Sequence, residues 1–367
     1  MPIYMDRHDL PGISLQDAAE AHHKDVELQE TYSCKAMTYW ADEKRGNAFC
    51  LIEAPDKQAV HDLHNKAHGL IPHEIIEVDD QVVELFLGRI HDPVAGADEE
   101  LSQLFDTAYR AIMVIESSNF LNRVEANQFT LFNQKFHSSV KKSIQKFKGR
   151  VILLNNNSYL LSFKSVTNAV LCALKIQNNF KYITPKFDSY LRRLKIGICI
   201  GSPVTDKELI FQDAINLSTF MCEVVKEQVV LSSEIKTVYD QENQNAFLNS
   251  EGVRTLKSRE EKFLIKLMDF INTRWNDPTL SNEDLCENLG YSRSQVYRKL
   301  MNLTGKSPNA FIRDFRLHKA LKSLYDQKGN ISEVAYESGF NSPAYFTRCF
   351  QDKYGILPSK YLQQHAN

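Results

Sequence analysis

The C-terminal third of the chain contains an internal repeat, which constrains the fold more than any other feature of the sequence. The pattern Leu285-Cys286-x-x-x-Gly290 returns forty-nine residues later as Val334-Ala335-x-x-x-Gly339, and after each glycine the offset becomes fifty. The pairs matched at the second offset are Val296 and Phe346, Arg298 and Arg348, Leu300 and Phe350, Gly305 and Gly355, and Pro308 and Pro358. Two copies of one structural unit are the economical explanation of such a repeat.

Each copy carries the residues that a helix-turn-helix unit needs. Cys286 and Ala335 are small enough for two helices to cross closely, and the glycine that follows allows the positive φ of a tight turn. Ser292 and Ser342 are placed to cap the second helix of their unit. The repeat therefore predicts an all-α domain with two helix-turn-helix units.

Helical spacing predicts a buried and an exposed face on the second helix of each unit. Val296 and Leu300 would face the core of the first unit, and Phe346 and Phe350 that of the second. The exposed residues that we expect to contact DNA are Arg293, Ser294, Tyr297, Arg298, Ser342, Ala344, Thr347 and Arg348. Further candidates for phosphate contacts are Lys299, Lys306 and Lys353. Arginine on such a helix can bind O6 and N7 of guanine in the major groove.

The sequence of this region resembles the AraC/XylS DNA-binding domain. The matching stretches include "LGYSRSQVYRKLMNLTGKSPNAFIRDFRL" and "ISEVAYESGFNSPAYFTRCFQDKYGILPSKY", and the resemblance covers residues 262–363. An amphipathic helix over Asn309–Tyr325 would hold the two units so that they enter major grooves about 10 bp apart. The resemblance implies a transcriptional regulator of double-stranded promoter DNA, usually an activator, with RNA polymerase as a second partner.

Residues 2–80 are predicted to form an α+β domain with the order βαββαβ, which is the ferredoxin-like arrangement. The expected strands are Ile3–Arg7, Lys35–Tyr39, Ala48–Glu53 and Glu74–Val78, and the expected helices are Ser14–Thr31 and Asp56–Gly69. Alternation of apolar positions, the Ser14 cap and the terminal Gly69 support these boundaries.

Histidine is concentrated in this first domain, where seven of the eleven lie. His64 and His68 are one helical turn apart, a spacing that lets two imidazoles reach one ion. The candidate ligands are His8, His22, Cys50, Glu53, His64 and His68. Imidazole-rich sites suit nickel, zinc or copper. The alternative is that these histidines are half-exposed helix and strand residues that hold no metal.

The stretches "MPIYMDRHDLPG", "AEAHHKD" and "TYWADEKRGNAFCLIEAPDKQAVHDLHNKAHGLIPHEIIEV" resemble a family of small ferredoxin-like proteins described as nickel-responsive or nickel-binding. The resemblance covers residues 1–79 and implies a metal-sensing domain.

The middle of the chain is predicted to be a connector, residues 81–107, followed by a second α+β domain, residues 108–250. We expect a strand at Val82–Leu87 within the connector. The second domain resembles a class III nucleotide cyclase domain, in the stretches "AIMVIESSN" and "GRVILLNNNSYLLSF" among others. The family positions that the resemblance assigns are Glu116, Leu153, Asn157, Asn216 and Phe220.

The expected cyclase chemistry is absent from these positions. Two carboxylates must hold the metal ions on the triphosphate. Glu116 could replace one, whereas Asn157 is neutral, and Phe220 stands where the family has an arginine. We therefore expect no catalytic residues and no enzyme, but a module for dimerisation or ligand sensing. An unrelated α+β domain, and an active cyclase fused to a DNA-binding domain, remain the alternatives.

Charge and cysteine content agree with a cytoplasmic DNA-binding protein. The net charge of −2 divides into −9 for residues 1–80, +3 for residues 81–258 and +4 for residues 259–367. Apolar runs are too short for a membrane span, the first ten residues show no secretory signal, and the seven cysteines are scattered. We expect no membrane contact, a DNA-binding domain over residues 259–367, and a homodimer as a further possibility.

Overall fold

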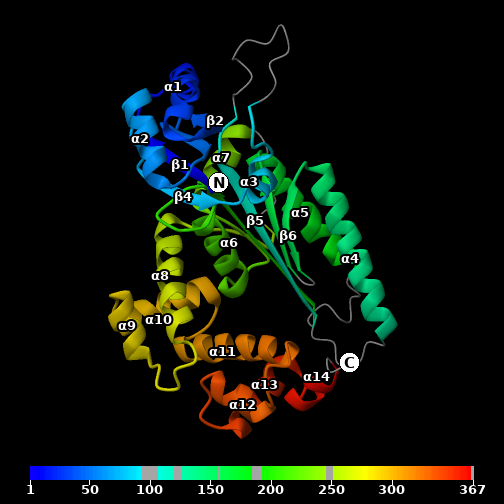
Figure 1. The fold of residues 1–367 in the computed structure, drawn as a ribbon. Helices are drawn as coiled ribbons and strands as arrows, with labels where there is room; N and C mark the ends of the chain where they lie inside the picture. Colours follow the sequence, from blue (N-terminus) through cyan, green and yellow to red (C-terminus); the bar gives the residue numbers. More distant parts are fainter. Residues whose placement is uncertain (93–105, 120–125, 156–157, 184–191, 245–250, 365–367) are drawn as a thin grey trace.

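The computed structural model describes residues 1–92, 106–119, 126–155, 158–183, 192–244 and 251–364. Figure 1 shows an N-terminal α+β domain, a middle domain built on a larger sheet, and a group of C-terminal helices at the opposite end from the N-terminal domain. Among the described residues, no helix combines the length and the apolar character that crossing a membrane requires.

The N-terminal domain has the predicted ferredoxin-like order. Its strands are β1 (Ile3–Asp9), β2 (Lys35–Asp42), β3 (Asn47–Glu53) and β4 (Glu74–Val78), and its helices are α1 (Leu15–Leu28) and α2 (Lys57–Ala67), with a 3-10 turn at Gln29–Tyr32. The strands pair antiparallel in the order β2-β3-β1-β4. Ser14 caps α1 in a capping box with Asp17, and Gly69 follows α2 with a φ of 76°.

The sheet of this domain is buried on both faces. Its side chains alternate between the two faces, and each face packs into a different hydrophobic cluster. Tyr4 and Ile52 pack under α1 and α2, whereas Met5, Phe49 and Leu51 point to the other face. That second face does not meet solvent but contacts the rest of the chain.

The predicted strand at Val82–Leu87 is wrong, because this segment is a helix, α3 (Asp80–Leu87). Asp79 caps it by accepting a hydrogen bond from the backbone N–H of Val82, and Gly88 ends it with a φ of 89°. Val83, Phe86 and Leu87 form its buried face at helical spacing. The predicted connector therefore begins with a packed helix.

The middle domain contains a six-stranded sheet in the order β10-β9-β8-β5-β7-β6. Its strands are β5 (Arg110–Asn119), β6 (Arg150–Asn155), β7 (Ser158–Phe163), β8 (Arg192–Gly201), β9 (Val229–Leu231) and β10 (Val253–Thr255). Its helices are α4 (Ala126–Lys146), α5 (Val166–Ile183), α6 (Gln212–Val224) and α7 (Ser233–Glu242). Helices α4, α5 and α7 cover one face of the sheet, and α6 packs on the other. This mixed sheet is an α+β arrangement, as expected.

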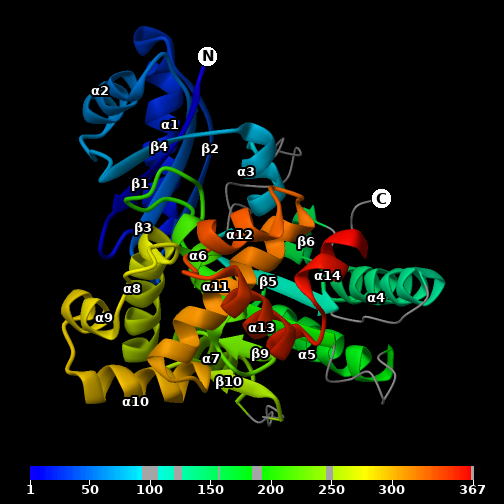
Figure 2. The same cartoon turned by 90° about the horizontal axis from the view of Figure 1, so that it is seen from below.

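The C-terminal domain is all-α, as predicted. Its helices are α8 (Ser258–Arg274), α9 (Asn282–Leu289), α10 (Arg293–Thr304), α11 (Pro308–Tyr325), α12 (Ile331–Glu337), α13 (Pro343–Tyr354) and α14 (Pro358–Gln364). Figure 2 shows these helices from below, with α11 passing between the first and the second unit.

The domains share hydrophobic cores rather than meeting at polar surfaces. Met5 and Phe49 of the N-terminal sheet lie in one cluster with Phe86 of α3 and with Ile112 and Phe211 of the middle domain. At the other end, α6 of the middle domain contributes to a cluster with α8, α9, α10 and α11. The three domains therefore form one continuous packed body.

We expect Phe86→Ala to destabilise the whole chain, because Phe86 is 2% exposed and fills the core between the N-terminal and middle sheets. Loss of a buried phenyl ring costs about 3–5 kcal/mol. The neighbouring Leu85→Ala is the matched control, since Leu85 is 43% exposed. Urea unfolding followed by circular dichroism measures both variants. A loss for Phe86→Ala no larger than that for Leu85→Ala would contradict the shared core.

Candidate nucleic-acid interface and candidate metal centre

The first helix-turn-helix unit is formed by α9 and α10, and its turn has the predicted geometry. Gly290 ends α9 with a φ of 72°, and Ser292 caps α10 in a capping box with Gln295. Val296 and Leu300 are at most 1% exposed in the core. The second unit, α12 and α13, repeats this design, with Gly339 at a φ of 77°.

The residues predicted to contact DNA lie mostly on the outer faces of α10 and α13. Arg293, Ser294, Tyr297 and Arg298 are exposed on α10, and Ala344 and Arg348 are exposed on α13. Thr347 is half-buried. Ser342 accepts the backbone N–H of Tyr345 at 3.4 Å as the cap of α13, which leaves its hydroxyl engaged within the helix.

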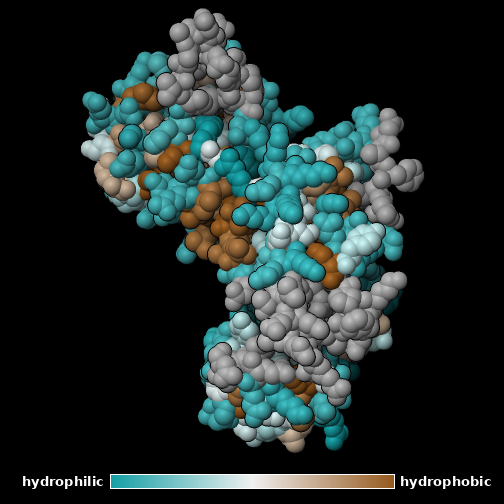
Figure 3. All heavy atoms as spheres, turned by 90° about the vertical axis from the view of Figure 1, so that its right-hand side faces the viewer, coloured by the Kyte–Doolittle hydropathy of each residue, from teal (hydrophilic) through white to brown (hydrophobic). Residues whose placement is uncertain are grey.

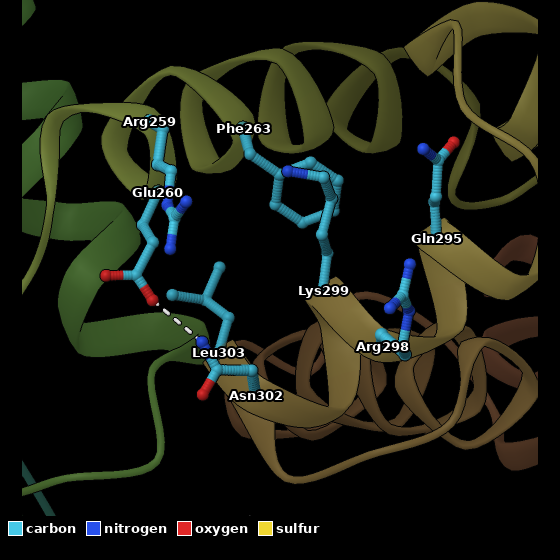
Figure 4. Close-up of a pocket in the computed structure, with 8 residues that line it drawn as sticks. All are labelled: Arg259, Glu260, Phe263, Gln295, Arg298, Lys299, Asn302 and Leu303. Carbon is cyan, nitrogen blue, oxygen red and sulfur yellow. Dashed lines mark hydrogen bonds between the residues drawn. The ribbon is translucent and has the colours of Figure 1, made fainter.

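Arg298 and Arg348 occupy equivalent positions and share one property. Neither makes a hydrogen bond or an ion pair with a residue that the structure describes. Figure 4 shows Arg298 and Gln295 on α10 beside a groove that α8 borders with Arg259 and Phe263. Two exposed guanidinium groups on two capped helices are the arrangement that major-groove reading requires.

The side chains predicted to contact phosphate already have partners within the protein. Arg293 forms an ion pair with Glu283. The ammonium of Lys299 lies 4.5 Å from the ring centroid of Tyr291, and that of Lys306 lies 2.7 Å from Asp314 Oδ2. Lys353 donates to the carbonyl of Asp314 at 2.7 Å, and burial lowers its pKa to about 7. Lys353 is thus a structural residue of the second unit.

The first unit is fixed to the middle domain at the end of α10. Arg254 of β10 donates to the carbonyl of Asn302 at 2.6 Å and pairs with Glu260 of α8 at 2.8 Å. The backbone N–H of Lys226 donates to the carbonyl of Leu303 at 3.2 Å. The side chain of Asn302 donates to Glu260 at 2.8 Å, drawn dashed in Figure 4. Any displacement of this edge of the middle sheet therefore carries α10 with it.

The candidate metal centre lies between the sheet and the helices of the N-terminal domain. Asp6 and His8 of β1, Cys50 of β3 and His64 of α2 place one donor atom each within 4.8 Å of one another. A second set with the same spacing consists of Asp25, His64 and His68. The distances from His64 are 2.8 Å to Asp6 Oδ2, 3.1 Å to Asp25 Oδ1 and 3.1 Å to His68 Nε2. His64 therefore links two overlapping donor sets.

The two buried carboxylates Asp6 and Asp25 favour positive charge within this cluster. Burial opposes the charged form of His64, but Asp6 and Asp25 outweigh it and raise its pKa to about 10. Burial and the same two carboxylates raise the pKa of the Cys50 thiol well above its usual value. His8 is 2% exposed, and its Nε2 lies 3.3 Å from Asp6 Oδ1 without the geometry of a hydrogen bond to any described residue. A buried imidazole beside a carboxylate fits a metal ligand.

Two predicted ligands lie elsewhere. His22 lies on the buried face of α1 one turn before Asp25, but its Nε2 lies 2.7 Å from Asp92 Oδ2 and its ring packs on Tyr39. Glu53 lies near the end of β3, 3.3 Å from the amino group of Met1. Both residues are therefore corrections to the predicted ligand set.

Sequence reasoning missed Asp6 and Asp25, which are each 1% exposed. Asp6 is two residues from His8 on the same face of β1, so strand periodicity could have found it. Asp25 could have been found only by knowing that α1 presents this residue to α2.

The positions singled out by the cyclase resemblance are dispersed. Glu116 lies on β5 at the boundary with α6 and α11, where burial and Glu223 raise its pKa to about 7 while Lys319 opposes them. Leu153 is 52% exposed on β6, and Phe220 is 7% exposed in the core shared with α8. Asn216 accepts a hydrogen bond from Gln212 at 2.8 Å. Asn157 lies outside the described residues.

Comparison with known proteins assigns the two ends of the chain. A helix-turn-helix domain family matches residues 285–364, and the family described as nickel responsive protein SCO4226-like matches residues 4–78. The C-terminal part is an AraC-type helix-turn-helix domain, and the N-terminal part is an SCO4226-like domain.

Individual relatives match only parts of the chain. A histidine kinase of Formosa agariphila is 33% identical over 30% of this chain and 8% of its own length. The transcriptional activator RhaS of Mannheimia succiniciproducens is 33% identical over 21% of this chain and 28% of its own. The crystal structure of SCO4226 from Streptomyces coelicolor is 32% identical over 21% of this chain and 94% of its own, with a TM-score of 0.20. The chain spans less than half the length of the curated relatives that it matches.

The metal centre predicts that chelator-treated protein takes up nickel, zinc or copper at micromolar concentration, as measured by calorimetry. His8→Ala removes a candidate ligand together with its 3.3 Å contact to Asp6, so it should weaken uptake by at least the roughly 10- to 100-fold expected for an outer-sphere partner. His22→Ala and Glu53→Ala are controls that should bind as the unaltered protein does. Equal losses in all three variants would contradict the assigned ligands, and circular dichroism checks their folding.

The buried carboxyl of Glu116, between β5, α6 and α11, predicts that the free energy of unfolding depends on pH. Its pKa is raised from 4.5 to about 7, so its contribution to folding is complete below the lower value and is lost as the pH rises through the upper one. Glu116→Gln cannot ionise, and we expect it to gain stability relative to the unaltered protein between about pH 5 and about pH 8. The exposed Glu208→Gln should show no such trend. Thermal unfolding across this range measures both, and parallel curves for the two variants would refute the assignment.

Proposed function

We propose that this protein is a transcriptional regulator that binds promoter DNA through its two helix-turn-helix units and responds to a transition metal bound in its N-terminal domain. The single observation that carries the DNA part is the pair Arg298 and Arg348, exposed and without partners among the described residues, at matching positions of α10 and α13. The relative RhaS is described as an activator, which supports activation as the mode of action, and contact with RNA polymerase stays a prediction.

The metal part of the proposal rests on the cluster around His64. Asp6, His8, Cys50 and His64 would hold the ion, with Asp25 and His68 as the adjoining donors. Two imidazoles and a thiol favour nickel, zinc or copper over calcium or magnesium. When bound, the ion would neutralise Asp6 and Asp25 and displace protons from His64 and Cys50. The similarity to an SCO4226-like family described as nickel responsive favours nickel.

The middle domain is, in this proposal, a link rather than an enzyme. It contacts the N-terminal sheet through Phe211 and the first DNA-binding unit through Met221. A metal that favours one packing of the N-terminal domain could shift α10 through these contacts and through the hydrogen bonds of Arg254 and Lys226 at the end of α10. Dimerisation stays a prediction. A second copy of the chain would add a second pair of DNA-binding units.

The test begins with genomic fragments bound by the purified protein at one fixed salt concentration, because phosphate contacts make affinity depend on salt. We expect a shared sequence with two subsites about one helical turn apart. Arg298→Ala and Arg348→Ala should each relax selectivity in one subsite, at a cost of about 1–3 kcal/mol. Lys24→Ala, which removes an exposed charge from α1, is the control and should change nothing.

Added nickel and added chelator form the second arm of this experiment. A metal-dependent affinity that disappears in His8→Ala would support sensing by the N-terminal domain. Failure to enrich any fragment, together with arginine variants that bind as the unaltered protein does, would refute the regulator. Sequence-specific binding that ignores the metal would refute the sensor alone.

A further inference from the structure

A long segment of the middle domain carries positive charge without any negative charge. Residues 126–187 contain ten lysines and arginines and no aspartate or glutamate, although the whole chain has 46 acidic residues against 44 basic ones. Over those sixty-two residues the net charge is +10 in a protein whose total is −2. An uninterrupted run of one sign indicates a polyanionic partner.

The structure gathers much of this charge on one surface. Helices α4 and α5 lie side by side on the outer face of the middle sheet and bury Phe136, Val140 and Ile176 against it. A groove of about 640 Å³ runs between their exposed sides. The lysines that line it are Lys135, Lys142, Lys146 and Lys175, and we call this surface the basic face.

The lysines of the basic face are not neutralised within the protein. Lys135, Lys142 and Lys175 are exposed and make no ion pair with any residue that the structure describes. Serine and asparagine hydroxyl and amide groups, such as those of Ser138 and Asn179, supply the remaining polar lining. The groove therefore offers cations and hydrogen-bond donors but no carboxylate.

The shape of the basic face suits an extended phosphate backbone. Lys135, Lys142 and Lys146 recur at i, i+7 and i+11 on one side of α4, which spans roughly 16 Å along the helix. Along one DNA strand phosphates repeat every 3.4 Å or so of helix axis, so such a row lies against several of them. Lysine contacts of this kind add affinity but carry no sequence information.

The position of the basic face relative to the DNA-binding domain completes the argument. In Figure 1 and Figure 2 the N-terminal end of α4 lies near α14, the helix that follows the second recognition helix, and the rest of α4 runs from there along the middle sheet. Figure 3 views the molecule from the side of α4, and hydrophilic residues cover much of the described middle part, next to an apolar patch closer to the N-terminal domain.

We propose that the basic face binds the phosphate backbone of DNA outside the sequence read by α10 and α13, so that the middle domain contributes to DNA binding. This inference rests on the proposed function, because it needs DNA already held by the helix-turn-helix units. It adds a sequence-independent contact that lengthens the bound segment of DNA.

The experiment compares two duplexes that carry the sequence recovered from the fragment selection. The short duplex holds that sequence alone, and the long duplex adds roughly 20 bp on each side. Binding is measured at several salt concentrations for the unaltered full-length protein and for the triple variant Lys135→Gln, Lys142→Gln and Lys175→Gln. The control is the triple variant Lys24→Gln, Lys57→Gln and Lys66→Gln, which removes three exposed charges from the N-terminal domain.

We expect the unaltered protein to bind the long duplex more tightly and with a steeper salt dependence than the short one. Three lost phosphate contacts should reduce the slope of log affinity against log salt by about 0.9 each on the long duplex. The same triple variant should bind the short duplex as the unaltered protein does, and the control variant should match the unaltered protein on both.

Four results would overturn the proposal. Equal affinity for the two duplexes, or equal losses in the variant and the control, would remove the basic face as a DNA contact while leaving operator binding intact. Loss of binding to phosphatidylserine vesicles in the variant, with unchanged binding to the long duplex, would assign the face to a membrane surface. Absence of binding to either duplex by the unaltered protein would refute the proposed function first and this inference with it.

Discussion

The burial of both faces of the middle sheet is the constraint on which the rest of the molecule depends. On β5, Met113 and Ile115 point toward α4 and α5, whereas Ile112 points the other way. That second face cannot be left in water, because its apolar surface is continuous with Phe211 and Val230. The N-terminal sheet and α8 cover what α6 leaves open, and α6 itself packs directly on β8, since a Cβ at Gly197 would collide with the carbonyl of Ser218. The terminal domains are thus parts of one fold rather than appendages.

The same alternation gives the candidate metal centre a mechanical connection to the remainder of the chain. Along β1, Asp6 and His8 lie on the face toward α1 and α2 and contribute to the candidate metal centre. Met5 lies on the opposite face, in the core shared with the middle domain. A change in the ligand geometry of Asp6 or His8 therefore moves a strand that is packed against α3 and β5 on its opposite face. Coupling of this kind needs two packings of the shared core and a ligand that favours one of them.

The sequence predicted well whatever depends on neighbours along the chain. Gly290 and Gly339 adopt the positive φ that the repeat implied, and Ser14 and Ser292 cap their helices. The strand predicted at Val82–Leu87 is a helix, because the spacing of apolar residues in so short a run does not distinguish a strand from a helix. Asp79, a residue type that commonly caps helices, was the sequence signal for the helix.

What depends on distant contacts could not be predicted. Asp25 enters the metal centre, and Lys353 turns inward to Asp314, only because helices remote in sequence pack together. The sequence alone does not distinguish a surface lysine from a buried one. Nor does it distinguish a solvated aspartate from one that faces a candidate metal site. For the same reason the sequence grouped His22 with the histidines of α2, although its ring packs on Tyr39 and its Nε2 lies 2.7 Å from Asp92.

The helix α11 restricts how a signal from the N-terminal domain could regulate DNA binding. Its first half packs Phe311 and Phe315 into the core of the first unit, and its second half packs Leu317 and Leu324 into the core of the second. A continuous helix held in both cores fixes the separation of α10 and α13, and Lys319 further ties it to Glu223 of α6 at 3.3 Å. A metal-driven movement cannot change that separation without breaking one of the cores. Regulation by the proposed metal would then move both units together, through the packing of α6 against α8, and would leave the separation of α10 and α13 unchanged.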